Sequence, residues 1–190
     1  MPFLTGKDLE ELQQVIRGCI LNDRTSQEKL YKQFYVSLFY MCRRFFRNEH
    51  EAIESVNDGM MKVFENIGTY QADKGSFFNW TYTIVRNTAL DKLKTSVAFQ
   101  QRYNGPGATD AVNEAGSDYN PLKALEQRDI YIMLDELSPA TRVVCVLFYI
   151  EGYAIKEIAQ QLGISAGTVK WHLSESRKNL KTIFKRHFNE

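Results

Sequence analysis

Apolar side chains recur at every third or fourth position along most of this 190-residue chain, and strict alternation of apolar and polar residues is nearly absent. The first spacing places apolar residues on one face of a helix, whereas alternation is typical of a half-buried strand. Four stripes of this kind occur before residue 94, over residues 9–20, 30–45, 53–67 and 77–93. The sequence therefore predicts an all-α protein.

The helical pattern fails between Gln100 and Asn120, where Gly, Pro, Ala, Asn, Asp and Ser replace most large apolar residues. A stretch of this length without periodicity is typical of an interdomain linker. Seven acids and two bases fall between Tyr103 and Glu136. We therefore expect a flexible acidic linker at residues 98–120, between an N-terminal helical domain and a smaller C-terminal helical domain at residues 121–188.

Charge and cysteine usage narrow the class of protein. The formal net charge is only +1, yet residues 168–190 hold six Lys or Arg against two acids, so the C-terminal tail is the better polyanion-binding surface. Three widely spaced cysteines, Cys19, Cys42 and Cys145, each lie in an apolar helical run, which indicates buried free thiols and a reducing compartment. Neither a signal peptide nor an apolar run of about 20 residues is present, so we expect a cytoplasmic protein.

A helix-turn-helix is predicted near the C-terminus. Ile155, Ile158 and Leu162 mark one face of a first helix, and Gly163 follows at the position where a helix end favours a left-handed residue. Ser165 is a suitable N-cap for a second helix, whose apolar stripe is expected at Val169, Leu173, Leu180 and Phe184. Two helices joined by so short a turn form a helix-turn-helix. Ala154 breaks the pattern, because a capping Ser or Thr would help to start the first helix.

The expected stripe leaves a basic and aromatic face on the second helix. Helices of this kind enter the major groove of DNA, where Lys and Arg donate to phosphates and guanines and an apolar ring contacts a thymine methyl or a sugar. A solvated surface helix is the alternative, and Glu175 is expected to pair with Lys178 more readily than with a base. The candidate DNA-binding residues of this domain are Ser165, Thr168, Lys170, Trp171, His172, Ser174, Glu175, Arg177 and Lys178.

Three segments resemble one known family. LSPATRVVCVLFYIEGYAIKEIAQQLGISAGTVKWHLSESRKNLK, residues 137–181, is similar to region 4 of bacterial RNA polymerase sigma factors of the sigma-70 family, extracytoplasmic-function (ECF) group. EAIESVNDGMMKVFENI, residues 51–67, resembles their region 2.2, and GSFFNWTYTIVRNTALDKLK, residues 75–94, resembles regions 2.3 and 2.4. The resemblance implies region 2 at residues 25–97, region 4 at residues 121–188, and an N-terminal helical extension at residues 1–24.

The resemblance also implies which residues of region 2 are functional. Its 2.2 helix is expected to dock on core RNA polymerase, and the loop and helix that follow are expected to capture a flipped base of the minus-ten promoter element. Trp80 lies on the apolar stripe, so we expect it to be buried. The implied polymerase-binding residues are Glu54, Val56, Asn57, Asp58 and Met61; the implied DNA-binding residues are Lys74, Phe77, Phe78, Asn79, Arg86, Asn87 and Lys92.

The implied function is that of a sigma factor, which binds core RNA polymerase and directs promoter recognition, strand opening and transcription initiation. Core RNA polymerase, promoter DNA and an anti-sigma factor are the implied partners. We expect no catalytic activity, metal or cofactor, because the three histidines lack partners at ligand spacing and no Gly-rich phosphate loop occurs. The alternatives are a response-regulator type activator, which needs a strand-helix receiver domain, and a helical protein-interaction adaptor.

Overall fold

The computed structural model describes residues 6–95 and 127–188, and these segments consist of helices joined by short turns and contain no strand. This confirms the predicted all-α class; the expected linker at residues 98–120 lies outside the described residues. The described residues divide into two compact units. The first is formed by residues 6–43 and 48–91, and the second by residues 44–47, 92–95 and 127–188.

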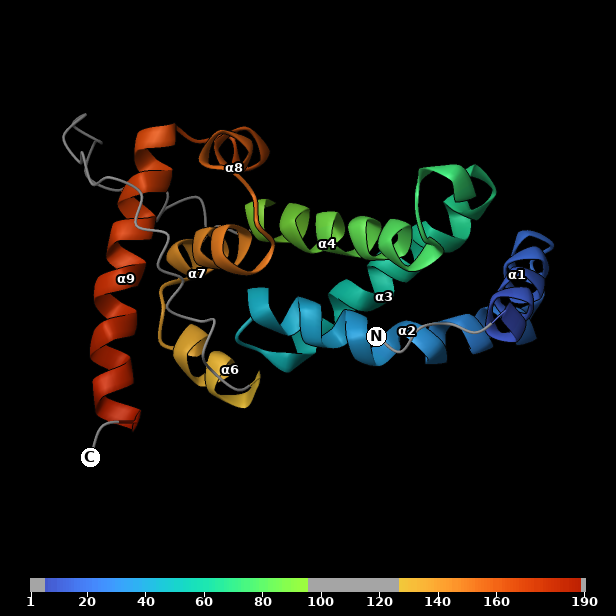
Figure 1. The fold of residues 1–190 in the computed structure, drawn as a ribbon, viewed down its shortest axis with the longest axis horizontal. Coiled ribbons are helices and arrows are strands. Elements are labelled where there is room, and N and C mark those ends of the chain that lie inside the picture. Colours follow the sequence, from blue (N-terminus) through green and yellow to red (C-terminus); the bar gives the residue numbers. More distant parts are fainter. Residues whose placement is uncertain (1–5, 96–126, 189–190) are drawn as a thin grey trace. The chain divides into compact units, whose positions relative to one another are not determined.

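The first unit contains α1 (Gly6–Ile20), most of α2 (Arg24–Phe45), α3 (Glu49–Asn66) and most of α4 (Phe77–Thr95), with the short turns η1 (Ile67–Thr69) and η2 (Ala72–Lys74) between α3 and α4 (Figure 1). The starts of α2 and α3 are capped by side chains. The Asp23 carboxylate accepts from the Ser26 N–H at 2.8 Å, and Asn48 accepts from the His50 N–H at 2.9 Å. Such caps satisfy backbone donors that a helix leaves unpaired.

The core of this unit follows the predicted stripes at most positions, but Leu9 and Ile20, at the ends of the first stripe, are about half exposed. Buried residues of α2 include Leu30, Phe34 and Leu38. In α3 the buried face includes Ala52 and Ser55, whereas Ile53, expected on the stripe, is 36% exposed.

Helices α3 and α4 lie in close contact at Gly59. A Cβ atom at this position would lie 2.8 Å from the Val85 Cα atom and 2.9 Å from its Cγ2 atom. No real side chain fits at these distances without moving a backbone, so the glycine sets the spacing of the two helices.

We predict that Gly59→Ala lowers the free energy of unfolding by about 1–3 kcal/mol, the usual cost of overpacking, even though Ala favours a helix by about 1 kcal/mol. Chemical denaturation of the full chain measures the change. Gly68→Ala is the matched control, because a Cβ atom there meets nothing within 4 Å. Equal stability of the two variants would contradict this account of the helix contact.

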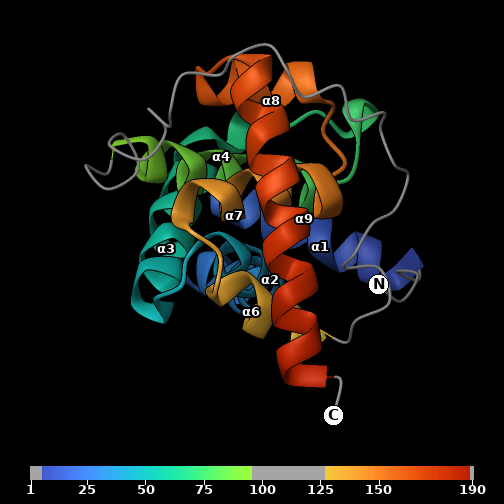
Figure 2. The ribbon, with the colours of Figure 1, turned by 90° about the vertical axis from the view of Figure 1, so that its left-hand side faces the viewer.

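The second unit contains α6 (Gln127–Asp135), α7 (Pro139–Cys145), the π-helical turn η3 (Val146–Ile150), α8 (Ile155–Leu162) and the long α9 (Ala166–Phe188). Helices α6, α7 and α8 all pack on α9, α6 near its C-terminal end and α8 near its N-terminal end (Figure 2). The buried stripe of α9 includes Val169, Leu173 and Leu180 as predicted, but it continues at Ile183, and Phe184 is 37% exposed.

Candidate nucleic-acid interface

The turn between α8 and α9 has the predicted geometry. Gly163 adopts a left-handed conformation with φ 69° and ψ 34°, and the Ile164 N–H donates to the Ala159 carbonyl at 3.0 Å. This hydrogen bond closes a Schellman motif, in which the left-handed residue ends the helix. Ser165 then caps α9, because its Oγ accepts from the Thr168 N–H at 3.0 Å.

The first helix of the motif replaces the missing cap by a different contact. Ala154 has no side-chain acceptor, yet its own N–H donates to the Glu157 carboxylate at 2.7 Å. Glu157 is the third residue of α8, so this is the carboxylate half of a capping box. One backbone donor before the helix is satisfied in this way, and the carboxylate also lies at the positive end of the helix dipole.

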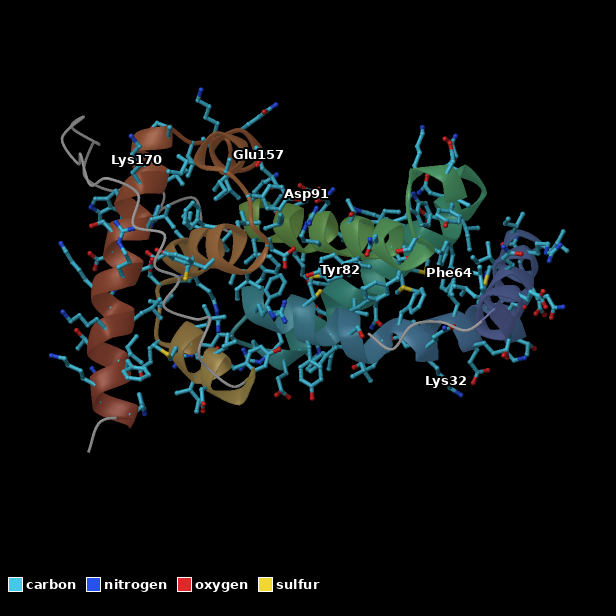
Figure 3. The ribbon with its side chains drawn as sticks, viewed as in Figure 1. Lys32, Phe64, Tyr82, Asp91, Glu157 and Lys170 are labelled. Carbon is cyan, nitrogen blue, oxygen red and sulfur yellow. The ribbon has the colours of Figure 1, made fainter. Side chains whose placement is uncertain are left out.

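The exposed side of α9 carries a line of lysines opposite the buried stripe. At 3.6 residues per turn, these positions and Ser174 share one face. Nitrogen-tipped side chains project from this side along α9, and Lys170 lies near its N-terminal end (Figure 3). We call this set the α9 lysine ridge; it consists of Lys170, Lys178, Lys181 and Lys185. Lys181 and Lys185 were missed in the sequence analysis, although the helical period from Lys170 would have found them.

Trp171 and Ser165, beside the ridge, are both exposed but differ in whether their side chains are already engaged. Trp171 is 38% exposed, so its ring reaches the surface of the N-terminal part of α9. Ser165 is also exposed, but its hydroxyl lies 2.9 Å from the Thr168 hydroxyl and serves the cap. Trp171 and Lys170 are therefore the side chains at the start of α9 that remain available to a groove.

His172 is a correction to the predicted DNA-binding set. It is 2% exposed, and its Nδ1 lies 3.0 Å from the Thr141 Oγ1 on α7. The Ser138 hydroxyl donates to the same Thr141 oxygen at 3.0 Å, so Thr141 can donate its proton to a neutral imidazole. Burial lowers the pKa of His172 to about 4. A neutral, buried ring cannot bind phosphate; its role is to join α7 to α9.

Two other predicted residues of α9 have protein partners. Glu175 accepts from the Asn179 side-chain amide at 3.2 Å, in place of the expected ion pair with Lys178. Arg177 is half-buried beside the Tyr149 hydroxyl, where its charge partly offsets the burial that raises the Tyr149 pKa. Arg177 is therefore partly committed to the fold of this unit.

In the first unit, a cavity of about 490 Å³ opens at the turns between α3 and α4. Its lining includes two of the predicted DNA-binding residues, Lys74 and Asn79, and also Tyr70, Trp80 and Thr83. Trp80 is half-buried and faces this cavity, which corrects the expectation that it is a core residue. Tyr70 and Thr83 were not among the predicted site residues.

Phe77 is a second correction. It is 3% exposed, and its ring packs against the rings of Tyr70 at 4.9 Å and Trp80 at 5.4 Å between centroids. On its other side it meets Phe34 of α2, at 6.1 Å. Phe77 therefore supports the aromatic wall of the cavity from inside and is not available for stacking on a base.

The remaining predicted residues of α4 are spread over its surface. Phe78 is half-buried, with its ring edge-on to Phe34 at 5.2 Å. Asn87 is exposed and continues the line of Asn79 and Thr83 along the helix. Arg86 lies beside this line, with its guanidinium 6.0 Å from the Tyr82 ring centroid. Lys92 is half-buried on a different side of α4, so the structure does not bring it together with the cavity.

The predicted polymerase-binding residues of α3 divide into exposed and buried positions. Met61 is 61% exposed and Asp58 is exposed, whereas Val56 is fully buried, which corrects its assignment as a contact residue. Asn57 is exposed, and its Oδ1 accepts from the Tyr31 hydroxyl at 2.7 Å. Glu54 is half-exposed and pairs with His50 at 3.2 Å. Val56 helps to hold the helix that presents the others.

No helix within residues 6–95 and 127–188 is both long and apolar enough to cross a membrane. In the same segments, no three His, Cys, Asp or Glu side chains are arranged so that they could hold a metal ion. The three cysteines are buried free thiols, and burial raises the pKa of Cys42 and of Cys145 to about 12.

A capped helix-turn-helix with a lysine ridge, joined in one chain to a helical unit with an aromatic-lined cavity, defines a helix-turn-helix DNA-binding protein. Comparison with known families identifies the family of DNA-binding proteins to which the chain belongs. Residues 30–98 match sigma-70 region 2, and residues 127–180 match sigma-70 region 4. The chain belongs to the sigma-70 family of RNA polymerase sigma factors, in its ECF group, and its function is to direct promoter-specific transcription initiation.

Several curated proteins are similar over most of this chain. The ECF RNA polymerase sigma factor SigE of Mycolicibacterium smegmatis is 28% identical over 170 residues, which are 87% of this chain and 64% of that protein. SigK of Mycobacterium ulcerans is 22% identical over 90% of this chain and 92% of its own length. Among solved structures, the sigma factor RpoE of Bartonella quintana, in complex with the anti-sigma factor NepR, has a TM-score of 0.46 at 21% identity, over 84% of this chain and 99% of that chain.

We predict that His172 makes the stability of this protein depend on pH. Its folded-state pKa of about 4 lies below the usual value of 6.5, so the unfolded chain binds a proton that the folded chain excludes. The stabilisation is complete above pH 6.5 and is lost as the pH falls towards 4. The expected loss is about 3 kcal/mol of unfolding free energy.

Chemical unfolding of the full chain between pH 7 and pH 4 measures this dependence. His172→Asn keeps an acceptor near Thr141 but cannot titrate, so its stability should fall less steeply than that of the wild type. His50→Asn, at an exposed position, serves as the control. Parallel pH curves for the wild type and His172→Asn would contradict the assignment.

Proposed function

We propose that this chain reads a promoter through two separate surfaces, the N-terminal part of α9 with its lysine ridge and the aromatic cavity of the first unit. The observation that carries the proposal is the exposed face of α9. It presents four lysines and Trp171, while its opposite face is buried against α6, α7 and α8. A protein-interaction adaptor has no need of a row of exposed lysines on a helix-turn-helix, so DNA is the favoured ligand.

The second unit is proposed to bind the minus-thirty-five element as a duplex. The start of α9 would enter the major groove, where Lys170 donates to a base edge or a phosphate and Trp171 contacts a thymine methyl or a sugar. Ser174, Lys178 and Lys181 follow on the same face and would contact phosphates as the helix leaves the groove. The hydroxyls of Ser165 and Thr168 hold the start of α9 in position, and the buried His172 joins this part of α9 to α7.

The cavity of the first unit is proposed to hold an unstacked base of the minus-ten element. A base taken out of a duplex needs an aromatic or apolar surface and hydrogen-bonding groups at its edge. The half-buried rings of Trp80 and Tyr70 supply the surface, and Asn79 supplies an amide. Lys74 at the rim would attract the adjacent phosphate. The line of Asn79, Thr83 and Asn87, with Arg86 beside it, would then follow the strand along α4.

Helix α3 is proposed to dock on core RNA polymerase. Asp58 and Met61 offer an exposed acid beside an exposed apolar side chain, and Glu54 lies one turn before Asp58. This combination suits a partner surface that carries basic residues around an apolar contact. Nucleotide addition would belong to the polymerase, because sigma factors act as initiation factors without an enzymatic reaction of their own.

The regulation and location of the chain follow from the same family assignment. An anti-sigma factor is proposed as a further partner, since it would compete for the polymerase-binding and DNA-binding faces. The chain is proposed to act in the cytoplasm, where the polymerase works. The proposed domain limits are residues 25–97 for region 2 and 121–188 for region 4, with the N-terminal extension at residues 1–24. A response-regulator type activator is not favoured, because the first described unit contains no strand for a receiver fold.

We predict that Lys170→Ala combined with Lys178→Ala weakens binding to promoter duplex and flattens its salt dependence. Each lost phosphate contact should reduce the slope of log affinity against log salt by about 0.9, hence by about 1.8 for two. Fluorescence anisotropy over a salt series measures both quantities, with the protein bound to core polymerase. Lys29→Ala combined with Lys32→Ala removes two exposed lysines of α2 as a control. An unchanged slope in the first variant would contradict DNA binding by this face.

We predict that Asp58→Lys weakens the complex with core RNA polymerase at least tenfold, about 1.4 kcal/mol, because it places a cation against a basic partner surface. Binding titration with labelled core enzyme measures the loss. Glu10→Lys makes the same charge change on α1 and should bind as the wild type does. If both variants bound polymerase equally well, α3 would not be the docking helix.

A further inference from the structure

Helix α1 lies outside the segment that matches sigma-70 region 2, which begins at residue 30. It nevertheless has a well-defined buried face. Leu12, Val15 and Cys19 are 7%, 9% and 1% exposed, while Leu9 and Ile20 at its margins are about half exposed. A helix with one apolar face of this kind packs on the domain by that face.

The corner between α1 and α2 is tightly constrained. A Cβ atom at Gly18 would lie 2.1 Å from the Ser26 Oγ atom, so only glycine allows the two helices to meet there. The Asp23 carboxylate accepts from the Ser26 hydroxyl at 2.6 Å, and the Asp23 N–H donates to the Gly18 carbonyl at 3.0 Å. These contacts fix the direction in which α1 leaves α2.

Helix α1 packs against η1, the turn that follows α3. Ile67, the first residue of this turn, is 4% exposed, and Thr69, its last residue, already lines the cavity. Figure 1 shows α1 at the same end of the first unit as η1, η2 and the start of α4. The segment that forms one wall of the cavity is therefore in contact with α1.

Tyr70 supports the same wall of the cavity through the aromatic cluster. The Tyr70 hydroxyl donates to the Gly75 carbonyl at 2.9 Å across the turn, and its ring packs on Phe77 and, at 5.7 Å, on Trp80. The position of the wall thus depends on two supports, the aromatic cluster inside and α1 outside. Loss of either support would change the width of the cavity. A base held there has to stack closely on an aromatic ring, so its binding would be sensitive to that width.

We propose that α1 is a brace for the cavity: by packing on η1 it sets the position of residues 69–71 and so controls how tightly an unstacked base is held. The inference rests on the proposed function of the cavity. Val15 belongs to the buried face of α1 and does not line the cavity, so it is a positioning residue whose effect on the cavity would pass through η1.

The test uses the full chain bound to core polymerase and the short single-stranded DNA that the wild-type complex selects from a random pool. Val15→Ala should weaken binding of this strand about tenfold, the loss expected when one base no longer stacks fully. Its affinities for core polymerase and for minus-thirty-five duplex should stay unchanged. Val15→Ile, which keeps a β-branched apolar side chain on the buried face of α1, should bind the strand as the wild type does. Leu38→Val, at a fully buried position of α2 that lines no part of the cavity, controls for general destabilisation.

Trp80→Ala separates failure of the brace from failure of the cavity. If Trp80→Ala weakens strand binding and Val15→Ala does not, the cavity assignment holds and the brace is overturned. If Val15→Ala reduces all three affinities alike, or Leu38→Val weakens strand binding as much as Val15→Ala, then α1 only stabilises the fold and the brace is again overturned. If Trp80→Ala leaves strand binding unchanged, the cavity is not the base site and the inference falls with it.

Discussion

Helix α9 is held along its length by α6, α7 and α8, and this packing determines which of its residues can meet DNA. Val169, Leu173 and Leu180 face inwards, and the Ser138–Thr141–His172 chain of hydrogen bonds joins the start of α7 to the same helix. At the other end, the Glu136 carboxylate pairs with Arg186 at 2.7 Å and with His187 at 2.5 Å. Because one face of α9 is fixed at both ends, the opposite face holds the lysine ridge in a regular row. Such a row of cations suits the regular spacing of phosphates in DNA.

In the first unit, a cluster of aromatic side chains determines the shape of the cavity. Phe34, Phe77 and Tyr70 form a continuous cluster whose inner members are buried, and Trp80 extends from it into the cavity wall. Rings are well suited to this task, because they give a large rigid surface with few rotatable bonds. The same cluster joins α2 to α4, so the stability of the unit and the shape of the cavity depend on the same contacts.

The local signals in the sequence were sufficient for the helix-turn-helix, and less so for the tertiary contacts. Gly163 and Ser165 have strong conformational and capping preferences, and both adopt the predicted roles. His172 was misassigned because a histidine at the margin of a stripe gives no sign of a buried partner 31 residues away. Val56 was assigned to the polymerase contact by family resemblance alone, although its spacing from Met60 and Val63 indicates the core. The shape of the cavity could not be predicted from periodicity, since turns form part of its lining, but the family resemblance assigned Lys74 and Asn79 to base capture and both line it.

The chain acts as an initiation factor only if both surfaces work on one promoter while the polymerase holds them. Transcription in vitro by core polymerase, on a pool of linear duplexes with random upstream sequence, tests this most directly. The account predicts that adding this chain gives transcripts that start at a fixed distance downstream of two separated sequence elements. Transcripts that depend on one element alone, or no increase over core polymerase without the chain, would contradict it.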